Sequence, residues 1–313
     1  MFVKDFREIS RRDVAVAGGK GASLGEMTRV GISVPSGFVV LADAFERFLA
    51  ETDLDVEVES ILHKVDHRKF HTVESASAKI KTLILEAKMP NDIAMEIKKN
   101  FKELKTKYVA VRSSATAEDS STAAWAGQLE SYLNTTKRNL LENVKRCWAS
   151  LFTPRAIFYR FEKKLHKQKI SVAVVIQKMV QSEVSGIAFT VHPVTKDKDQ
   201  MVVEAGYGLG EAIVGGIITP DTYVVLKNQK SPVIFDKNIS NQAKMIVCSA
   251  PGTKEKEIPS AKREKQKLAD KEILQLAKIC LMIEKHYGCP QDIEWAYAGK
   301  KIYIVQSRPI TTL

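Results

Sequence analysis

The pattern of hydrophobic and polar positions predicts that the first half of the chain is mostly helical. Residues from about 42 to 105 follow a helical pattern rich in charged positions, with a break at Met89-Pro90. Helices are expected again from about 140 to 167. Between these stretches, the apolar run 108–111 is typical of a short strand, which we expect to end at Arg112.

β-Branched residues gather in the second half, in runs bounded by Gly, Pro and Asp that are typical of strands. The predicted strands cover residues 172–179, 185–190, 201–204 and 223–226, and a helix over 272–287 precedes two more strands at 292–297 and 301–308. This mixture favours an α+β protein of two lobes. We place the boundary near 179–182, which gives an N-terminal lobe over residues 1–180 and a C-terminal lobe over residues 181–313.

A lysine surrounded by glycines is the first candidate for chemistry. In Gly18-Gly19-Lys20-Gly21 it lies just before a predicted helix. Glycines allow close approach of an anion, and both the helix N-terminus and the ammonium group favour negative charge. The segment is not a P-loop, because no Lys-Ser or Lys-Thr follows a GxxxxG frame. A tight turn with a solvated lysine is the alternative interpretation.

Arg112 is the second candidate, since a loop of small and hydroxyl residues follows it over 113–127. Its planar guanidinium can bind two phosphate oxygens at once, and the loop offers further donors. Glu118 and Asp119 in this loop argue against a purely anion-binding role. A flexible surface loop next to an arginine is the alternative.

The two predicted C-terminal strands alternate polar and apolar residues. The polar positions are Asp292, Glu294, Gln306 and Arg308, and the apolar ones are Ile293, Trp295, Tyr303 and Val305. Side chains two residues apart share a strand face. A three-residue turn at 298–300 pairs Asp292 with Gln306 and Glu294 with Ile304, and it places all four polar residues on one face. A two-residue turn would shift the register by one residue and mix the two sets, so the three-residue turn is predicted.

Such a polar face is suited to phosphate chemistry. Carboxylates hold Mg²⁺, a hard cation whose remaining positions accept phosphate oxygens, which makes Asp292 and Glu294 candidate metal ligands. Arg308 would then neutralise charge on a transferring phosphoryl group. An amphipathic surface hairpin with a cross-strand charge pair is the alternative.

Composition and charge argue against several function classes. The net charge of +11 would suit a nucleic-acid partner, but the lysines are dispersed or mixed with glutamates. The aromatic residues, 7% of the chain, do not interleave with basic runs as a base-stacking surface requires. No apolar run approaches the roughly 18 residues that span a bilayer, and the N-terminus lacks the apolar region of a secretory signal. We therefore expect a cytoplasmic protein without nucleic-acid or membrane partners.

Seven short blocks occur in the order in which one family carries them. They are GGKGASLGEM (18–27), VPSGF (34–38), VRSSATAED (111–119), AGQ (126–128), GLGE (208–211), DIEW (292–295) and VQSRP (305–309). With these blocks the chain resembles the N-terminal domain of phosphoenolpyruvate synthases, which pyruvate phosphate dikinase and rifampin phosphotransferase share. The resemblance covers essentially the whole chain and implies an ATP-grasp-type fold that holds ATP and Mg²⁺ between two lobes.

The resemblance also implies contacts to ATP or its metal from both lobes. Those of the first lobe are phosphate contacts from Lys20 and Arg112, a loop over the nucleotide containing Gly127 and Ser131, and a contact at the adenine end of the hinge from Gln177. Those of the second are magnesium ligation by Asp292 and Glu294 and phosphate contacts from Gln306 and Arg308. The catalytic roles fall to Lys20, Arg112 and Arg308.

Full-length members of this family also carry a swivelling domain with a phosphorylated histidine and a domain for pyruvate or phosphoenolpyruvate. None of the six histidines here lies in the glycine- and threonine-rich turn of that swivelling domain. We therefore expect a phosphotransferase module that passes phosphoryl or pyrophosphoryl from ATP to a histidine on a separate domain, in cis or in trans, for pyruvate phosphorylation. The alternatives are the module of a rifampin-type antibiotic phosphotransferase and a non-catalytic ATP-binding regulatory subunit.

Overall fold

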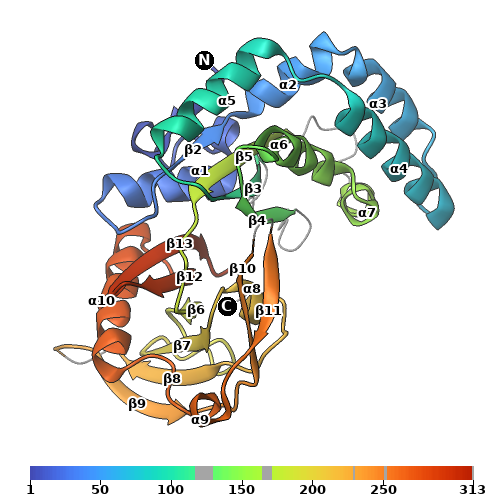
Figure 1. The fold of residues 1–313 in the computed structure, drawn as a ribbon. Coiled ribbons are helices and arrows are strands. Elements are labelled where there is room, and N and C mark those ends of the chain that lie inside the picture. Colours follow the sequence, from blue (N-terminus) through green and yellow to red (C-terminus); the bar gives the residue numbers. More distant parts are fainter. Residues whose placement is uncertain (117–129, 164–170, 228–229, 250–251, 312–313) are drawn as a thin grey trace. The chain divides into compact units, whose positions relative to one another are not determined.

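The computed structural model of the chain describes residues 1–116, 130–163, 171–227, 230–249 and 252–311. Helices and strands both occur and the strands form separate sheets, which confirms the predicted mixture of α and β elements (Figure 1). The chain divides into two compact units: a first unit of Met1–Arg29 and Ser36–Met179, and a second unit of Val30–Pro35 and Val180–Leu313. Within the described ranges, no helix combines the length and apolar character that crossing a bilayer requires.

The first unit is built on a five-stranded antiparallel sheet with the strand order β1-β2-β5-β3-β4. Its strands are β1 (Val3–Asp5), β2 (Gly37–Val40), β3 (Val109–Ala115), β4 (Ser131–Thr135) and β5 (Val172–Lys178). The central strand β5 has the sequence VAVVIQK, and its first six residues are buried. Such a continuous buried run is expected where other elements cover both faces of a sheet.

Helix α1 (Val14–Arg29) packs on one face of this sheet and contains the glycine-rich segment. A Cβ atom on Gly21 would lie 3.1 Å from a methyl group of Val39 on β2, so the helix and the strand are in direct contact. Because side chains alternate along a strand, Val39 identifies the face of the sheet that α1 covers.

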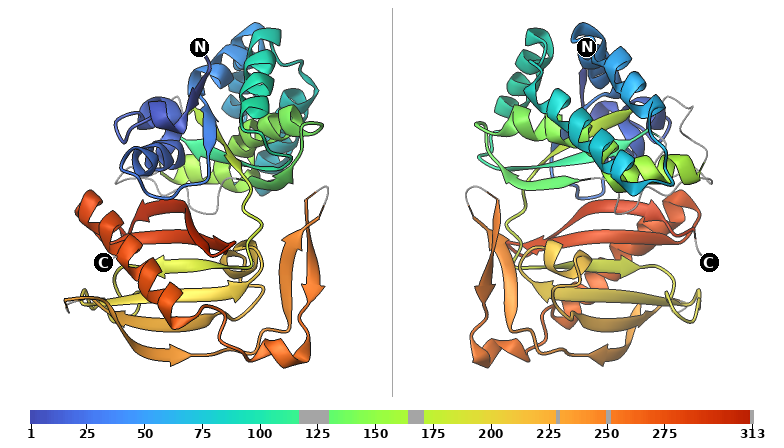
Figure 2. Two further views of the ribbon diagram at one scale, coloured as in Figure 1. Left: turned by 60° about the vertical axis from the view of Figure 1, so that its left-hand side comes forward. Right: turned by 90° about the vertical axis from the view of Figure 1, so that its right-hand side faces the viewer.

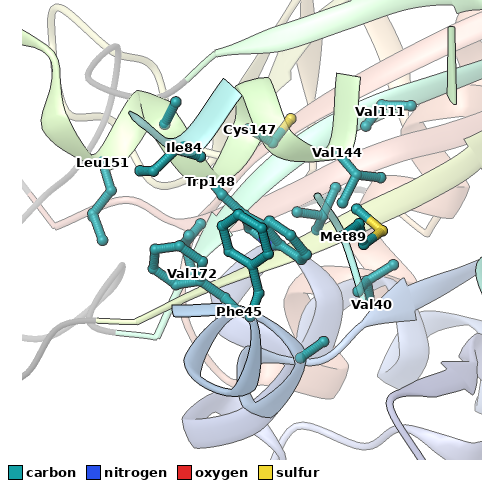
Figure 3. Packing of buried hydrophobic residues seen from close by; sticks show 14 of the residues in the cluster. Val40, Phe45, Ile84, Met89, Val111, Val144, Cys147, Trp148, Leu151 and Val172 are labelled. Carbon is teal, nitrogen blue, oxygen red and sulfur yellow. The ribbon is translucent and has the colours of Figure 1, made fainter. Parts of the chain in front are cut away.

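The opposite face carries the hydrophobic core of the first unit. The helices that pack over this core are α2 (Ala42–Glu51), α3 (Leu54–His63), α4 (Phe70–Glu86), α5 (Asn91–Glu103), α6 (Leu140–Ala149) and α7 (Pro154–Glu162). Trp148 and Phe45 lie together in this core (Figure 3). The centroid of the Trp148 ring is 5.5 Å from that of Phe45 and 5.0 Å from that of Phe48. Aromatic rings bury large apolar areas, so they contribute strongly to such a core.

The helical pattern between residues 42 and 105 is confirmed as four helices, and the predicted break at Met89-Pro90 separates α4 from α5. The expected end of the strand at Arg112 is wrong, because β3 continues to Ala115. Ser113 and Ser114 are buried and pair with β5. Their small side chains fit between packed elements, and hydrogen bonds satisfy their hydroxyl groups.

The second unit is built on a six-stranded antiparallel sheet with the order β13-β12-β6-β7-β8-β9. The strands are β6 (Val184–Phe189), β7 (Gln200–Tyr207), β8 (Asp221–Leu226), β9 (Val233–Asn238), β12 (Gln291–Ala298) and β13 (Lys301–Pro309). Helix α10 (Asp270–Tyr287) lies across the sheet and contacts β12 and β9 (Figure 2). The short helices α8 (Glu211–Val214) and α9 (Ser260–Arg263) lie in its connections.

A separate hairpin of β10 (Lys244–Cys248) and β11 (Thr253–Glu257) completes the second unit. The segment that leads from this hairpin to α10 is attached to β8 by a buried ion pair. Lys267 Nζ lies 2.8 Å from Asp221 Oδ1, and neither side chain is exposed to solvent. The Tyr223 hydroxyl donates to the other carboxylate oxygen of Asp221 at 2.7 Å. These bonds stabilise the Asp221 carboxylate, whose negative charge would otherwise be costly to bury.

Candidate functional site

The glycine-rich segment of α1 is fixed against β3 by close contact. Gly18 has φ 68°, and a Cβ atom there would lie 2.2 Å from Ser114 Oγ and 2.3 Å from its carbonyl oxygen. Ser114 Oγ donates to the Ala17 carbonyl oxygen at 3.0 Å and accepts from the Gly21 amide at 3.2 Å. The kink in α1 therefore requires glycine, and it holds the start of the following helical turns next to the strand that carries Arg112.

Lys20 lies between these glycines and is partly exposed. Burial raises the pKa of the Cys147 thiol, the charge of Glu130 adds to this shift, and the Lys20 ammonium opposes it. Lys20 is therefore within electrostatic reach of Cys147. The same neighbourhood contains Ser113, whose hydroxyl donates to the Glu130 carbonyl oxygen at 2.7 Å. In the chain, Lys20 comes two residues after Gly18, which is held against Ser114 of β3.

Three further predicted residues share the face of the sheet that α1 covers. Arg112 lies opposite Val175 of β5 and opposite Ser131 of β4. Gln177 is two residues from Val175 on β5, so its side chain points to the same face as Arg112. Ser131 is exposed, whereas Gln177 is buried with 3% of its surface accessible. The predicted residue Gly127 lies outside the described ranges.

In the second unit, the predicted register of the C-terminal hairpin is wrong. Ala298 pairs with Lys301, so the turn has two residues, Gly299 and Lys300, with φ 56° and 63°. Positive φ at both positions is characteristic of a type I′ turn, whose twist matches that of paired strands. The predicted three-residue turn is therefore not present.

A β-bulge compensates for the shorter turn. Trp295 pairs with Ile304 but Glu294 pairs with Gln306, so Val305 is the extra residue. Beyond the bulge Asp292 pairs with Arg308. Directly opposite residues share a face, so the four polar side chains do lie together, although the predicted pairs Asp292–Gln306 and Glu294–Ile304 are wrong.

The bulge also changes the position of Tyr303, which was predicted on the apolar face. It lies opposite Ala296, and Ala296 points to the same side of β12 as Glu294. The amide of Ile304, next to the bulge, donates instead to the Ser33 carbonyl oxygen at 2.9 Å. This bond ties the segment Val30–Pro35 to the second unit.

Asp292 and Arg308 form a direct ion pair on this face. Arg308 Nε and Nη2 donate to Asp292 Oδ2 at 2.9 and 2.7 Å. Burial raises the pKa of the Asp292 carboxyl, and the charge of Arg308 opposes that shift. Both bonds go to the same carboxylate oxygen.

Glu204 on β7 is a third carboxylate of the same face, and the sequence analysis missed it. Ile187 of β6 pairs with Glu204 on one side and with Glu294 on the other, so the three side chains form one row across the sheet. Burial, and then the charge of Asp292, raise the pKa of the Glu204 carboxyl. The available signal was an acidic residue inside the buried run MVVEA.

The oxygen donors of this face fit Mg²⁺. Within the described part of the chain, no three His, Cys, Asp or Glu side chains are close enough to hold a metal by themselves. Mg²⁺ in proteins is typically bound by one or two carboxylates, together with waters and substrate phosphates. Asp292 and Glu294, with the amide oxygen of Gln306 beside them, supply that number of ligands.

The turn at Gly208-Leu209-Gly210-Glu211 is held rigidly in the second unit. The Gly208 carbonyl oxygen accepts from Ser182 Oγ at 2.9 Å and from Ser185 Oγ at 2.6 Å. Gly208 has φ 87°, which a residue with a side chain would rarely adopt. Glu211 begins α8 and accepts from Thr253 Oγ1 at 3.0 Å.

Comparison with known families shows which family the chain belongs to. Residues 14–313 match the family described as the pyruvate phosphate dikinase, AMP/ATP-binding domain. The chain belongs to this family. The match covers nearly the whole chain and both units, and it confirms the resemblance that the seven sequence blocks indicated.

The curated relatives of this dikinase-family domain are longer proteins. The chain is 47% identical to a probable phosphoenolpyruvate synthase of Methanocaldococcus jannaschii, over 100% of this chain and 27% of the relative. It is 41% identical to the phosphoenolpyruvate synthase of Pyrococcus furiosus, over 100% of this chain and 44% of the relative. It is 39% identical to the rifampicin phosphotransferase of Bacillus cereus, over 100% of this chain and 36% of the relative. The chain thus spans less than half the length of these relatives.

Proposed function

We propose that the chain is the Mg-ATP-binding phosphotransferase module of a phosphoenolpyruvate synthase-like enzyme. In this proposal the lobes at residues 1–180 and 181–313 act as the two lobes of an ATP-grasp-like domain, and both contribute residues to one nucleotide. Membership in the dikinase AMP/ATP-binding family supports ATP as the nucleotide.

The observation that carries the proposal is the pairing of Asp292 with Arg308 and of Glu294 with Gln306 on one face of the second unit. Asp292 and Glu294 would hold Mg²⁺, which neutralises and orients phosphate oxygens when it is bound. Gln306 would donate to a phosphate through its amide. Arg308 would stabilise the charge that develops on the transferring group.

The first unit would supply the remaining contacts from the face that α1 covers. Lys20 and Arg112 would bind phosphate oxygens, and together with Arg308 they are the proposed catalytic cations. Ser131, with Gly127 in the preceding loop, would cover the nucleotide. The buried amide of Gln177 would contact the adenine, since an amide offers both a donor and an acceptor.

The acceptor would be a histidine on a domain that this chain does not include. Phosphoryl transfer requires an acceptor held close to the phosphorus and in line with the leaving group. The length of the relatives supports further domains in cis, and a partner in trans would meet the same need. Pyruvate is the proposed final acceptor, because two of the three relatives described above carry the name phosphoenolpyruvate synthase.

Calorimetric titration with Mg-ATP tests the proposal. The parent chain should bind, and Glu294→Gln should weaken magnesium-dependent binding by roughly tenfold or more, because a metal ligand loses its charge. Glu59→Gln, on the exposed side of α3, is the matched control and should bind as the parent does. No binding by the parent, or unchanged binding by Glu294→Gln, would sink the proposal.

A rifampin-type module is the second candidate, and the 39% identity to rifampicin phosphotransferase supports it. Both candidates bind the same nucleotide, so ATP titration does not separate them. An assay in trans separates them: the remaining domains of a synthase or of a rifampicin phosphotransferase are added to the chain, and product formation is followed. A chain that binds Mg-ATP but transfers no phosphate to the histidine of either partner would be a regulatory subunit instead.

A further inference from the structure

A basic groove on the first unit is not used by the nucleotide chemistry. A hollow of about 680 Å³ lies where α5 ends, and it is lined by Lys98, Lys99, Phe101, Lys102, Lys105, Thr106, Lys107 and Lys137. We call these eight residues the lysine groove. Six of them are lysines, and all six are exposed.

The lysine groove concentrates charge that the sequence analysis expected to be dispersed. Residues 98–107 contain five lysines and a single acidic residue, Glu103, and Lys137 joins them from the connection after β4. Throughout the part of the chain that the structure describes, none of these six lysines lies within ion-pair distance of a carboxylate. Like charges held together repel, so a bound anion would relieve a cost that the free protein carries.

The backbone at Lys105 allows one of these lysines to be removed without straining the fold. Lys105 follows the end of α5 and has φ 48°, in the left-handed region. Helices commonly end with glycine at such a position, because glycine has no Cβ atom to strain. A lysine is less favourable there than glycine, so replacing Lys105 by glycine removes the charge without adding backbone strain.

The chemistry of the lysine groove selects among anions. A compact phosphate site usually uses backbone amides at a helix N-terminus or a glycine-rich turn. The groove instead lies at the C-terminal end of α5, where carbonyl oxygens carry partial negative charge, and residues 98–107 contain no glycine. All its charged donors are long, flexible lysine side chains, which suit several separate anionic groups better than one small anion.

Nucleic acid fits the lysine groove less well than an acidic polypeptide does. Single-stranded nucleic acid needs aromatic rings on which bases stack, but Phe101, the groove's aromatic residue, is only 6% exposed. The lining also contains no arginine, the side chain that most often reads phosphates and bases with two bonds. Carboxylates spaced along a peptide need neither feature.

We propose that the lysine groove binds an acidic segment of a partner protein. Asp and Glu side chains of that segment pair with Lys98, Lys102 and Lys105, while the apolar stems of the lysines cover the peptide backbone. Such a contact is independent of ATP, so it does not rest on the proposed function.

Fluorescence polarisation with a labelled deca-glutamate peptide tests this proposal. The parent chain should bind the peptide at low salt and release it as the salt concentration rises. Lys105→Gly should weaken binding by roughly 1.5- to 5-fold, the value of one exposed ion pair. This variant should fold, because glycine suits the left-handed backbone at residue 105.

Lys196→Gly is a matched control for both charge and backbone. Lys196 is exposed, has φ 60° and lies in the second unit, away from the groove residues in the chain. This variant should bind the peptide as the parent does. The proposal would be overturned if the parent did not bind the peptide at low salt, or if both variants lost the same amount of affinity. It would also be overturned if tripolyphosphate or oligo(dT) displaced the peptide at a lower concentration of charge than free poly-glutamate does.

Discussion

Asp292 shows how one carboxylate can serve two partners. Arg308 donates twice to Oδ2 of Asp292, at 2.9 and 2.7 Å. In the proposed site, Oδ1 would face the metal while Oδ2 keeps the guanidinium in position. The positive charge of Arg308 opposes the rise in the pKa of Asp292 that burial causes, so it favours the ionised form that a metal needs.

Gly18 combines a close steric contact with a left-handed backbone. Gly18→Ala should destabilise the fold by about 2–4 kcal/mol, because a Cβ atom would overlap Ser114 and the backbone is left-handed. Gly31→Ala is the matched control: it has φ 81° with no atom within 4 Å, so only backbone strain of about 1 kcal/mol is expected. Urea unfolding measures both, and equal losses would contradict the packing argument.

Glu204 gives a prediction about pH. Its pKa is raised above the ordinary value of 4.5 in the folded protein, so above that value the folded state holds more protons than the unfolded chain. Stability therefore falls as the pH rises through the window between the unfolded and folded pKa. Glu204→Gln has no such charge to bury. Without Mg²⁺, the variant and the parent should have similar free energies of unfolding at about pH 4. At about pH 8 the variant should have the higher free energy of unfolding.

Urea unfolding at several pH values measures this difference. Glu59→Gln, on the exposed side of α3, is the control for the loss of a surface carboxylate. A Glu204→Gln variant that is less stable than the parent above the window would mean that the carboxylate is stabilised in the folded state rather than penalised.

Among the elements, the C-terminal hairpin shows how a turn and a bulge act together. The type I′ turn alone would offset the alternation of β13 against β12 by one residue, and the extra residue Val305 restores it. The bulge also turns the Ile304 amide toward Ser33. One irregularity therefore both assembles the polar face and attaches a distant segment of the chain.

The buried ion pair that anchors the segment before α10 gives a prediction at the scale of elements. Lys267→Met should destabilise the protein by about 3–5 kcal/mol, because it leaves the Asp221 charge buried without its partner. The double variant Asp221→Asn/Lys267→Met should recover part of that loss. Lys244→Met, in the exposed pair of Lys244 with Glu255 at 3.0 Å, should cost less than about 1 kcal/mol. A double variant no more stable than Lys267→Met would contradict the pairing argument.

At the scale of the whole molecule, the chain corresponds to one part of longer relatives. Its described residues supply candidate contacts for a nucleotide and a metal, and the proposed acceptor histidine belongs elsewhere. A binding module and a transfer partner can then be tested separately, since ATP binding does not depend on the acceptor.

The isolated chain should bind Mg-ATP without forming AMP in response to pyruvate. The physical reason is that no acceptor is held in line with the phosphate, so only slow hydrolysis by water remains. Incubation with pyruvate, magnesium and β-labelled ATP measures this outcome, and a catalytically complete synthase is the positive control. Appreciable phosphoenolpyruvate, or a stable labelled histidine on this chain, would show that the module is self-sufficient.

The sequence by itself determined the family and the mixture of elements, and it supplied the hypothesis for the site. Hydrophobic periodicity reports the burial of each position, which is why the helices between residues 42 and 105 were predicted with their break at Met89-Pro90. Ordered motif blocks identify a family because each block alone is common but their order is not. The roles of Lys20, Arg112, Glu294 and Arg308 follow from the same blocks and stay predictions.

Only the tertiary structure decided the register of the hairpin, the length of β3 and the third carboxylate. Register depends on a bulge that relocates one amide to Ser33, a contact between segments far apart in the chain. The strand continues through Ser113 and Ser114 because α1 and β5 pack against small side chains there. Glu204 and Glu294 share a row because Ile187 of β6 lies between them, and local sequence does not show that β6 separates their two strands. Pairings between distant segments follow from packing and not from local alternation, because alternation fixes which residues share a face of a strand but not which strand lies beside it.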